Sequence, residues 1–312
     1  MGTPEFAVGT LDAICQSKHE VVAVVTATDK PSGRGLKLQF SEVKEYALAH
    51  NIPLLQPAKL KDPEFIDSLK TFNADIFVVV AFRMLPHDVY SLPPMGTFNV
   101  HASLLPNYRG AAPIHHAVIN GEKETGVTTF FLNQEIDKGD IIESRSVTIG
   151  DTETTGELYD RLMKVGAQLA VETLDAIEVG SVKRKPQIHI DEQTLKLAPK
   201  IFKEDTHIFW NDTAQNVFNK IRGLSPFPGS FSLIEKKSGE SLFVKWIEVE
   251  KTDVLATENP GTIVTDGRKY LFVAAQDFMI SIKKLQLQGK TKMDVVQFLS
   301  GFRLENYSNV LK

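Results

Sequence analysis

Short apolar runs alternate with longer amphipathic segments through the first 180 residues of the chain. Apolar runs of about four to eight residues are typical of buried strands, whereas apolar residues that recur every three or four positions are typical of helices. The alternation predicts an α/β fold, with a doubly wound, Rossmann-like sheet. The predicted strands are 21–26, 76–81, 97–101, 127–132 and 141–147, and the predicted helices are 5–17, 41–50, 63–72, 111–119 and 155–179.

The pattern changes after residue 180. A basic segment with Lys183, Arg184 and Lys185 follows, and its composition is typical of a linker. Beyond it, short apolar segments separated by turn residues predict a small all-β barrel. Its strands are expected at 208–210, 229–234, 242–249, 261–264, 270–274 and 279–287. We therefore divide the chain into a first domain at 1–180, a linker at 181–203 and a second domain at 204–312.

Charge divides the chain in the same way. Residues 1–180 hold 15 Lys and Arg against 24 Asp and Glu, whereas residues 181–312 hold 20 against 15. A basic accessory domain is expected when that part of a protein binds a polyanion. The first domain also contains a basic, glycine-containing loop with Lys30, Arg34 and Lys37. Such a loop suits a phosphate backbone, although a solvated connection has the same composition.

Candidate chemistry gathers in residues 97–110, which read TFNVHASLLPNYRG. Asn99 and His101 are two residues apart in a predicted strand, so their side chains leave the same face of the sheet. A histidine in an apolar strand is commonly a hydrogen-bonded core residue. A third group favours a site instead, because Asp140 directly precedes the strand at 141–147 and is expected to reach His101. A carboxylate beside an imidazole fixes its tautomer and favours its charged form.

These residues resemble the catalytic pattern of the formyltransferase family that uses 10-formyltetrahydrofolate. In that family an Asn, a His two residues on, an SLLP turn and a later Asp support attack of an amine on a formyl carbon. The resemblance implies that Asn99 and protonated His101 donate hydrogen bonds to the developing oxyanion. It also implies that Asp140 holds His101 charged and helps to move the proton that the amine loses.

The same resemblance implies a folate site. Residues 81–86, AFRMLP, are similar to the loop that receives the pterin ring, although Arg83 stands where the family often has a small residue. The expected folate-binding residues are Ser103, Leu104, Leu105 and Pro106 of the SLLP turn, and Phe82, Arg83, Met84 and Leu85 of this loop.

Further stretches at 1–7, 221–229 and 285–290 resemble the branch of the family that formylates methionyl-tRNA. That branch has an OB-like C-terminal barrel and acts on initiator methionyl-tRNA, which would be a partner beside tetrahydrofolate. The expected tRNA contacts are Lys30, Arg34, Lys37, Lys183, Arg184 and Lys185. A monomer would serve this chemistry.

Composition argues against several other classes of protein. The single Cys15 excludes an internal disulfide, and neither a signal peptide nor an apolar run of membrane-spanning length is visible. We therefore expect a cytoplasmic protein without a membrane partner. Neither of the common glycine-rich phosphate motifs is present, which argues against a dinucleotide or nucleoside triphosphate cofactor. No metal is implied.

The beginning of the chain departs from the family. There, the string Met-Gly-Thr-Pro follows a buried, central strand, and this chain starts at that string. Removing a central strand would leave its two neighbours with unpaired backbone groups. We therefore expect that the first strand is missing before Met1 and that the numbering begins at an internal methionine.

Two alternatives stay open at this point. A formyltransferase for an amino sugar nucleotide would share Asn99, His101 and Asp140, but it should lack the basic loop at 30–37. A non-catalytic RNA-binding or folate-binding protein would keep the fold without needing the three polar residues together.

Overall fold

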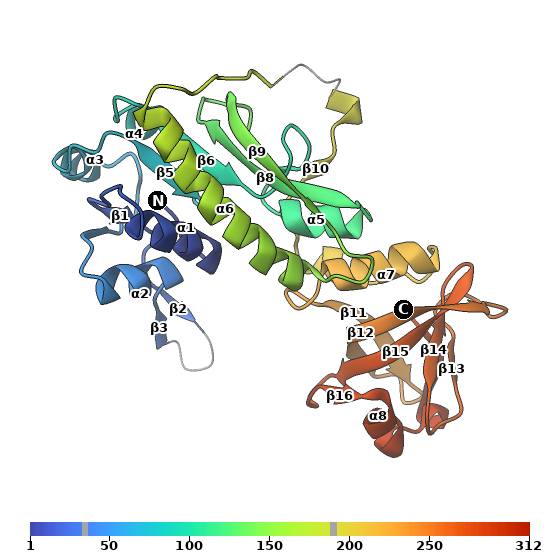
Figure 1. Cartoon of the computed structure of the whole chain (residues 1–312). Helices are drawn as coiled ribbons and strands as arrows, with labels where there is room; N and C mark the ends of the chain where they lie inside the picture. The colour runs from blue at the N-terminus through green and yellow to red at the C-terminus, as the bar shows by residue number, and fades with distance from the viewer. Residues whose placement is uncertain (33–36, 188–191) are drawn as a thin grey trace. The chain divides into compact units, whose positions relative to one another are not determined.

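The computed structural model describes residues 1–32, 37–187 and 192–312 (Figure 1). These residues form two compact units. The first contains Met1–Pro113, Glu124–Thr148 and Tyr159–Ala198, and the second contains Ile114–Lys123, Ile149–Leu158 and Pro199–Lys312. Both units are therefore discontinuous in sequence, and much of the predicted linker belongs to the first unit.

A mixed four-stranded sheet forms the centre of the first unit, in the order β5-β6-β8-β9. These strands are β5 (Phe77–Val80), β6 (Thr97–His101), β8 (Glu124–Phe131) and β9 (Ile141–Thr148). β5 and β6 run parallel, and β6, β8 and β9 are antiparallel neighbours. β6 is thus paired along both edges, which holds its side chains in a fixed register.

Helices flank this sheet, and α6 (Thr155–Glu178) crosses one face of it (Figure 1). The hydroxyl of Thr173 on α6 lies 2.9 Å from that of Thr129 on β8. Gly166 allows close approach, since a Cβ there would lie 3.3 Å from Val100 of β6. The other helices of the first unit are α1 (Glu5–Cys15), α2 (Glu42–Ala49), α3 (Pro63–Lys70) and α4 (His87–Tyr90). The predicted α/β fold class is confirmed.

A separate parallel pair, β1 (Val24–Val25) and β4 (Leu54–Leu55), lies beside Met1 and Gly2. The Gly2 amide donates to the Val25 carbonyl at 3.0 Å, and the Val80 amide donates to the Met1 carbonyl at 2.9 Å. Met1 and Gly2 therefore connect β1 with β5. Desolvation lowers the pKa of the Met1 α-amino group to about 5. A cavity of about 330 Å³ adjoins them, lined by residues that include Ile14, Val24, Phe77, Val78 and Leu174. The missing first strand stays a prediction.

Short pairs complete the first unit. β2 (Lys30–Ser32) and β3 (Lys37–Gln39) are antiparallel, and β7 (Arg109–Gly110) pairs in parallel with β10 (Leu197–Ala198). A 3₁₀ turn at Glu192–Thr194 precedes β10. The pairing of β7 with β10 ties residues close to the candidate site to the later part of the predicted linker.

The second unit is an antiparallel barrel with the strand order β13-β14-β15-β12-β11-β17. An isolated bridge between Thr262 and Val310 and a hydrogen bond from the Leu311 amide to the Gly261 carbonyl bring its two edges together. The predicted barrel is therefore confirmed. Its strands are β11 (Ser230–Lys236), β12 (Ser241–Leu255), β13 (Ile263–Thr265), β14 (Leu271–Ala274), β15 (Phe278–Leu287), β16 (Met293–Asp294) and β17 (Tyr307–Leu311).

Helices α7 (Ala214–Gly223) and α8 (Val295–Gly301) pack against this barrel. The second unit also contains most of α5 (Pro113–Ile119) and 3₁₀ turns at Glu204–Thr206 and Leu304–Asn306. The predicted strand at 208–210 is wrong. Ile208 and Trp210 are buried in irregular backbone, and the Ile208 amide donates to the Phe231 carbonyl. Their side chains join the barrel core, where the Ser232 hydroxyl accepts hydrogen bonds from the indoles of Trp210 and Trp246.

Candidate active site

Asn99 and His101 lie on β6, between β5 and β8. Asn99 pairs with Val79 on one side and with Phe130 on the other, and His101 pairs with Thr128. Because strand side chains alternate between faces, Asn99 and His101 project from the same face, as the sequence predicted. His101 is 6% exposed, whereas Asn99 is partly exposed. An amide and an imidazole therefore leave the same face of a strand that is paired along both edges.

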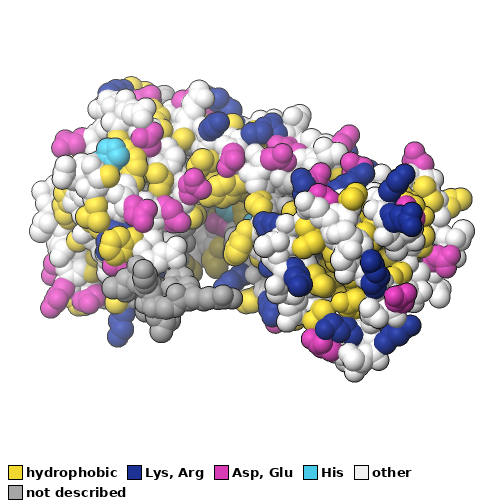
Figure 2. All heavy atoms as spheres, turned by 90° about the horizontal axis from the view of Figure 1, so that it is seen from below, with side chains coloured by type: hydrophobic (Ala, Val, Ile, Leu, Met, Phe, Trp, Pro, Cys, Tyr) yellow, Lys and Arg dark blue, Asp and Glu magenta, His cyan; other side chains and the backbone are white. Residues whose placement is uncertain are grey.

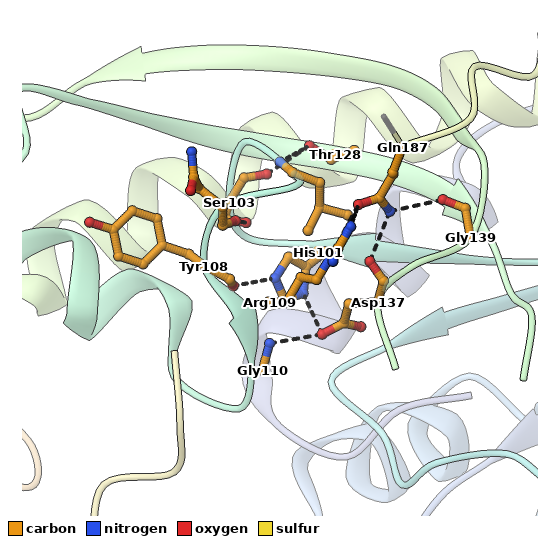
Figure 3. A network of polar contacts seen from close by, with 11 residues as sticks. His101, Ser103, Tyr108, Arg109, Gly110, Thr128, Asp137, Gly139 and Gln187 are labelled. Carbon is orange, nitrogen blue, oxygen red and sulfur yellow. Dashed lines mark hydrogen bonds and ion pairs between the residues drawn. The ribbon is translucent and has the colours of Figure 1, made fainter. Parts of the chain in front are cut away.

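The ring of His101 is oriented by both of its nitrogens (Figure 3). Nε2 donates to the carbonyl oxygen of Tyr108 at 2.9 Å, which fixes a proton on that nitrogen. Nδ1 faces the carboxylate of Asp137, whose Oδ2 lies 3.9 Å away. This distance is longer than a hydrogen bond, so the carboxylate faces the ring without a direct contact.

The expected contact between Asp140 and His101 is wrong, because the carboxylate beside His101 is that of Asp137. The loop between β8 and β9 turns back at Asp137, where φ is +54°. Its Oδ2 also accepts the amide of Gly110 at 2.9 Å. Asp140 lies at the base of the hairpin, where its carbonyl accepts the amide of Phe131. Both aspartates stand in the string EIDKGD, and the turn decides which one faces the histidine.

The SLLP turn packs against β8. The Leu105 amide donates to the hydroxyl of Thr128, and that hydroxyl lies 2.7 Å from the Ser103 carbonyl and donates to it. The Ser103 hydroxyl donates to the Asn107 carbonyl. Ser103 and Leu105 are buried, while Leu104 and Pro106 are partly exposed. These contacts fix the backbone that leads from His101 to Tyr108 (Figure 3).

The loop after β5 divides its predicted folate residues between core and surface. Leu85 is 5% exposed and belongs to a hydrophobic cluster with Val25 and Phe65, whereas Met84 is 65% exposed. The guanidinium of Arg83 donates to the carbonyls of Pro57 and Ala58 and lies 5.3 Å from the ring of Phe82. Arg83 thereby ties the loop to the segment that follows β4.

The predicted tRNA contacts occupy two places in the first unit. Lys30 and Lys37 lie on the paired strands β2 and β3, and Arg34 lies outside the described residues. At the base of this hairpin, the Lys44 ammonium and the Gln56 amide hold the pKa of the Asp29 carboxyl below its ordinary value.

The second place is the basic linker, where Lys183, Arg184 and Lys185 are exposed. The backbone of Lys185 exchanges two hydrogen bonds with Ile141, and the Arg184 guanidinium lies 4.2 Å from the centre of the Phe131 ring. This part of the linker is therefore attached to the first unit, next to the hairpin that carries Asp137.

A basic and aromatic surface lies on the second unit. Lys200 is near the exposed ring of Phe202, Lys220 is near the exposed ring of Phe209, and Lys203 is near Phe243. Figure 2 shows Lys and Arg side chains interleaved with hydrophobic ones over the part of the molecule on the right. Positive charge beside flat apolar rings suits a nucleic acid, which offers phosphates and stacking surfaces.

Among the described residues, one group of side chains has the spacing of a metal site, namely His19, Asp175 and Glu178. The ammonium of Lys18 lies 3.1 Å from Asp175 and 2.6 Å from Glu178, so these carboxylates already have a cationic partner. No helix in the described ranges is long and apolar enough to cross a membrane.

Comparisons with known proteins cover both units. Residues 1–174 match the family described as "Formyl transferase", and residues 200–303 match "Formyl transferase, C-terminal domain". The chain is 50% identical over 305 residues to a methionyl-tRNA formyltransferase of Bacteroides fragilis, covering 97% of this chain and 94% of the relative. It is 46% identical over 310 residues to a methionyl-tRNA formyltransferase of Flavobacterium johnsoniae, covering 99% and 97%.

A solved structure shares the fold at much lower sequence identity. WlaRD, a sugar 3N-formyl transferase crystallised in the presence of dTDP and 5-N-formyl-THF, superposes with a TM-score of 0.65 at 20% identity. The superposition covers 93% of this chain and 97% of that one. At this identity the likeness establishes the arrangement of helices and strands and nothing finer.

Proposed function

We propose that this chain, which belongs to the formyl transferase family, transfers the formyl group of 10-formyltetrahydrofolate to the amino group of initiator methionyl-tRNA. The observation that carries the proposal is 50% identity over almost the whole chain to a methionyl-tRNA formyltransferase. The identity extends through both units, so it includes the sheet that carries His101 as well as the basic barrel.

In the proposed reaction the methionyl amine attacks the formyl carbon, and a new C–N bond forms while the carbonyl oxygen becomes an oxyanion. The Asn99 amide and the Nδ1–H of a doubly protonated His101 would stabilise this oxyanion by hydrogen bonding, since Nε2–H is donated to the Tyr108 carbonyl. Each donor of this kind contributes about 3 to 4 kcal/mol in other acyl-transfer sites. The bond between the formyl carbon and the folate nitrogen then breaks, and this nitrogen takes up a proton.

Asp137 has two roles in this proposal. Its carboxylate lies 3.9 Å from Nδ1 of His101 and would stabilise positive charge on the ring during the reaction, and a charged ring donates more strongly than a neutral one. It is also the nearby base for the proton that the attacking amine loses, either directly or through one water. The Gly110 amide holds Oδ2 at 2.9 Å and keeps the carboxylate facing the ring.

The formyl donor is proposed to bind between the SLLP turn, Ser103–Pro106, and the loop at Phe82–Leu85. Leu85 anchors that loop in the core, and Arg83 fixes it through the carbonyls of Pro57 and Ala58. The backbone of the loop would then present hydrogen-bonding groups to the pterin. No step of this reaction calls for a metal, so a chelator should leave the rate unchanged.

The tRNA is proposed to contact the basic segment with Lys30, Arg34 and Lys37, the exposed linker residues Lys183, Arg184 and Lys185, and the basic and aromatic surface of the second unit. Contacts with phosphates release counterions, so the affinity should fall steeply with salt. We propose that the enzyme acts as a cytoplasmic monomer.

A second candidate substrate is an amino sugar nucleotide, because a sugar 3N-formyl transferase shares the fold over 93% of this chain. One assay compares the two. The protein is incubated with 10-formyltetrahydrofolate and either charged initiator tRNA or a dTDP-amino sugar, and formylated product is measured by mass spectrometry. We expect product with the tRNA alone. Formylation of the sugar alone would overturn the proposal, as would the absence of both products.

A further inference from the structure

Gln187 makes four hydrogen bonds around the hairpin that carries Asp137 (Figure 3). Its side-chain nitrogen donates to the carbonyl oxygens of Asp137 and Gly139, each at 2.8 Å. Its side-chain oxygen accepts Nε of Arg109 at 3.1 Å and Nη2 of Arg109 at 2.5 Å. Both hydrogens of the amide and its oxygen are thus engaged, which fixes the orientation of the side chain.

The two carbonyls belong to the turn that aims the carboxylate at His101. Asp137 has a left-handed backbone, which is unfavourable for a residue with a side chain and needs support from its surroundings. Gly139 lies so close to β8 that a Cβ there would come within 1.6 Å of the Phe131 carbonyl oxygen. Gln187 bonds the carbonyls on both sides of Lys138 and so closes this turn.

Arg109, which bonds the side-chain oxygen of Gln187, links Gln187 to the residues that hold the Asp137 carboxylate. It belongs to β7, and the next residue, Gly110, donates its amide to the Asp137 carboxylate. Gln187 therefore joins the backbone that carries Asp137 to the strand that holds its side chain. The pairing of Lys185 with Ile141 and the stacking of Arg184 on Phe131 bring the linker to this position.

From these contacts we infer that Gln187 is a positioning residue for formyl transfer, which acts by holding the Asp137 carboxylate against His101. The inference rests on the proposed function of Asp137. Gln187 lies in a stretch that sequence composition predicted to be a linker with a tRNA-binding role, and its amide serves the catalytic hairpin instead.

Two substitutions test this role. Gln187→Ala removes all four hydrogen bonds. Gln187→Glu keeps an acceptor for Arg109 but cannot donate to the carbonyls of Asp137 and Gly139. A displacement of about 1 Å at a catalytic group can cost about 100-fold in rate. We expect both variants to lower kcat by about 10- to 100-fold and to change KM for tRNA and folate by less than about twofold. If Gln187→Glu keeps the wild-type kcat, the inference is overturned.

A double-mutant cycle with Asp137→Asn separates positioning from general stability. If Gln187 acts through the carboxylate, Gln187→Ala should cost less than about twofold once Asp137 is already Asn. Multiplicative losses in kcat would overturn the inference. Wild-type activity of Asp137→Asn itself would instead refute the proposed role of Asp137. Gln168→Ala is the matched control, since Gln168 is exposed on α6 and its side chain bonds Glu172. It should leave kcat unchanged.

Discussion

His101 and Asp137 face each other across the candidate active site, but the chain holds them in different ways. His101 belongs to β6, which is paired on both edges and buries the ring to 6% exposure. Asp137 belongs to a hairpin turn, and its direction depends on contacts from Gly110 and Gln187. A residue on a central strand keeps its place when neighbours change, whereas a turn residue does not. Substitutions near Asp137 should therefore affect catalysis without touching the reacting atoms.

The largest effect is expected on the strand side of the site. His101→Ala removes a proposed oxyanion donor and leaves the carbonyl of Tyr108 without its ring partner. We expect kcat/KM for formylation to fall by about 1,000-fold. Steady-state kinetics with charged tRNA measure the loss, and the melting temperature checks that the fold is kept.

His50→Ala is a suitable control for that substitution, because His50 is exposed at the end of α2 and stacks on Tyr46. It should change kcat/KM by less than about twofold. Near wild-type activity of His101→Ala would show that the strand side of the site plays no part in the reaction.

The turn side gives the next largest effect and distinguishes two neighbouring aspartates. Asp137→Asn removes the negative charge that lies 3.9 Å from the imidazole, so kcat should fall by about 100-fold. Asp140→Asn changes a residue at the base of the hairpin, and its kcat should stay within about twofold of the wild-type value. Both substitutions are nearly isosteric, so their kcat values compare charge at two positions. A greater loss in Asp140→Asn would restore the assignment made from sequence.

That mistaken assignment shows where sequence patterns stop being informative. Alternation in TFNVH was sufficient to place Asn99 and His101 on one face, because the period of a strand fixes side-chain direction. No comparable period exists in EIDKGD, where one left-handed residue reverses the direction of the chain. Gln187 was missed for a related reason. Its partners are backbone carbonyls about fifty residues earlier, and they leave no pattern in the sequence.

The barrel offers the same lesson. Its strands β11, β12 and β15 overlap predicted strands, since β11 and the first half of β12 alternate buried with more exposed positions and β15 contains a run of four buried residues. Residues 208–210 were predicted as a strand because they are apolar, yet they enter the core without regular pairing.

Helix α7 was not predicted, although Thr213 caps it by accepting the amide of Asn216. The discontinuous units depend on contacts such as Arg222 with the carbonyls of Gly150 and Glu153, which composition does not reveal.

A smaller effect should come from the backbone of the turn. In Gly139→Ala the new methyl group would lie 1.6 Å from the Phe131 carbonyl oxygen, so the hairpin must shift. We expect kcat to fall about tenfold and the melting temperature to drop by a few degrees. Gly301→Ala is the matched control, because nothing lies within 4 Å of a Cβ at Gly301. Equal kcat values for the two variants would mean that the turn tolerates displacement. The proposed difference between a sensitive turn and a fixed strand β6 would then be wrong.

The smallest effect is expected next to β5, the neighbour of β6. There, Met1 and Gly2 join β5 to β1 beside the apolar cavity of about 330 Å³. Adding an extended segment of apolar, β-branched residues before Met1 should fill this space and convert the buried α-amino group into an amide. The melting temperature should rise by a few degrees.

The pH dependence gives this prediction a specific signature. Burial lowers the pKa of the α-amino group from 8.0 to about 5, so the unfolded chain binds more protons than the folded chain between these values. As far as it depends on this group, the free energy of unfolding is therefore greatest above about pH 8 and decreases as the pH falls towards 5. The extended protein lacks this group and should lose that part of the slope. Melting curves of both proteins between pH 5 and 8 measure the difference. If the extension lowers the melting temperature at every pH, the cavity does not accept a strand.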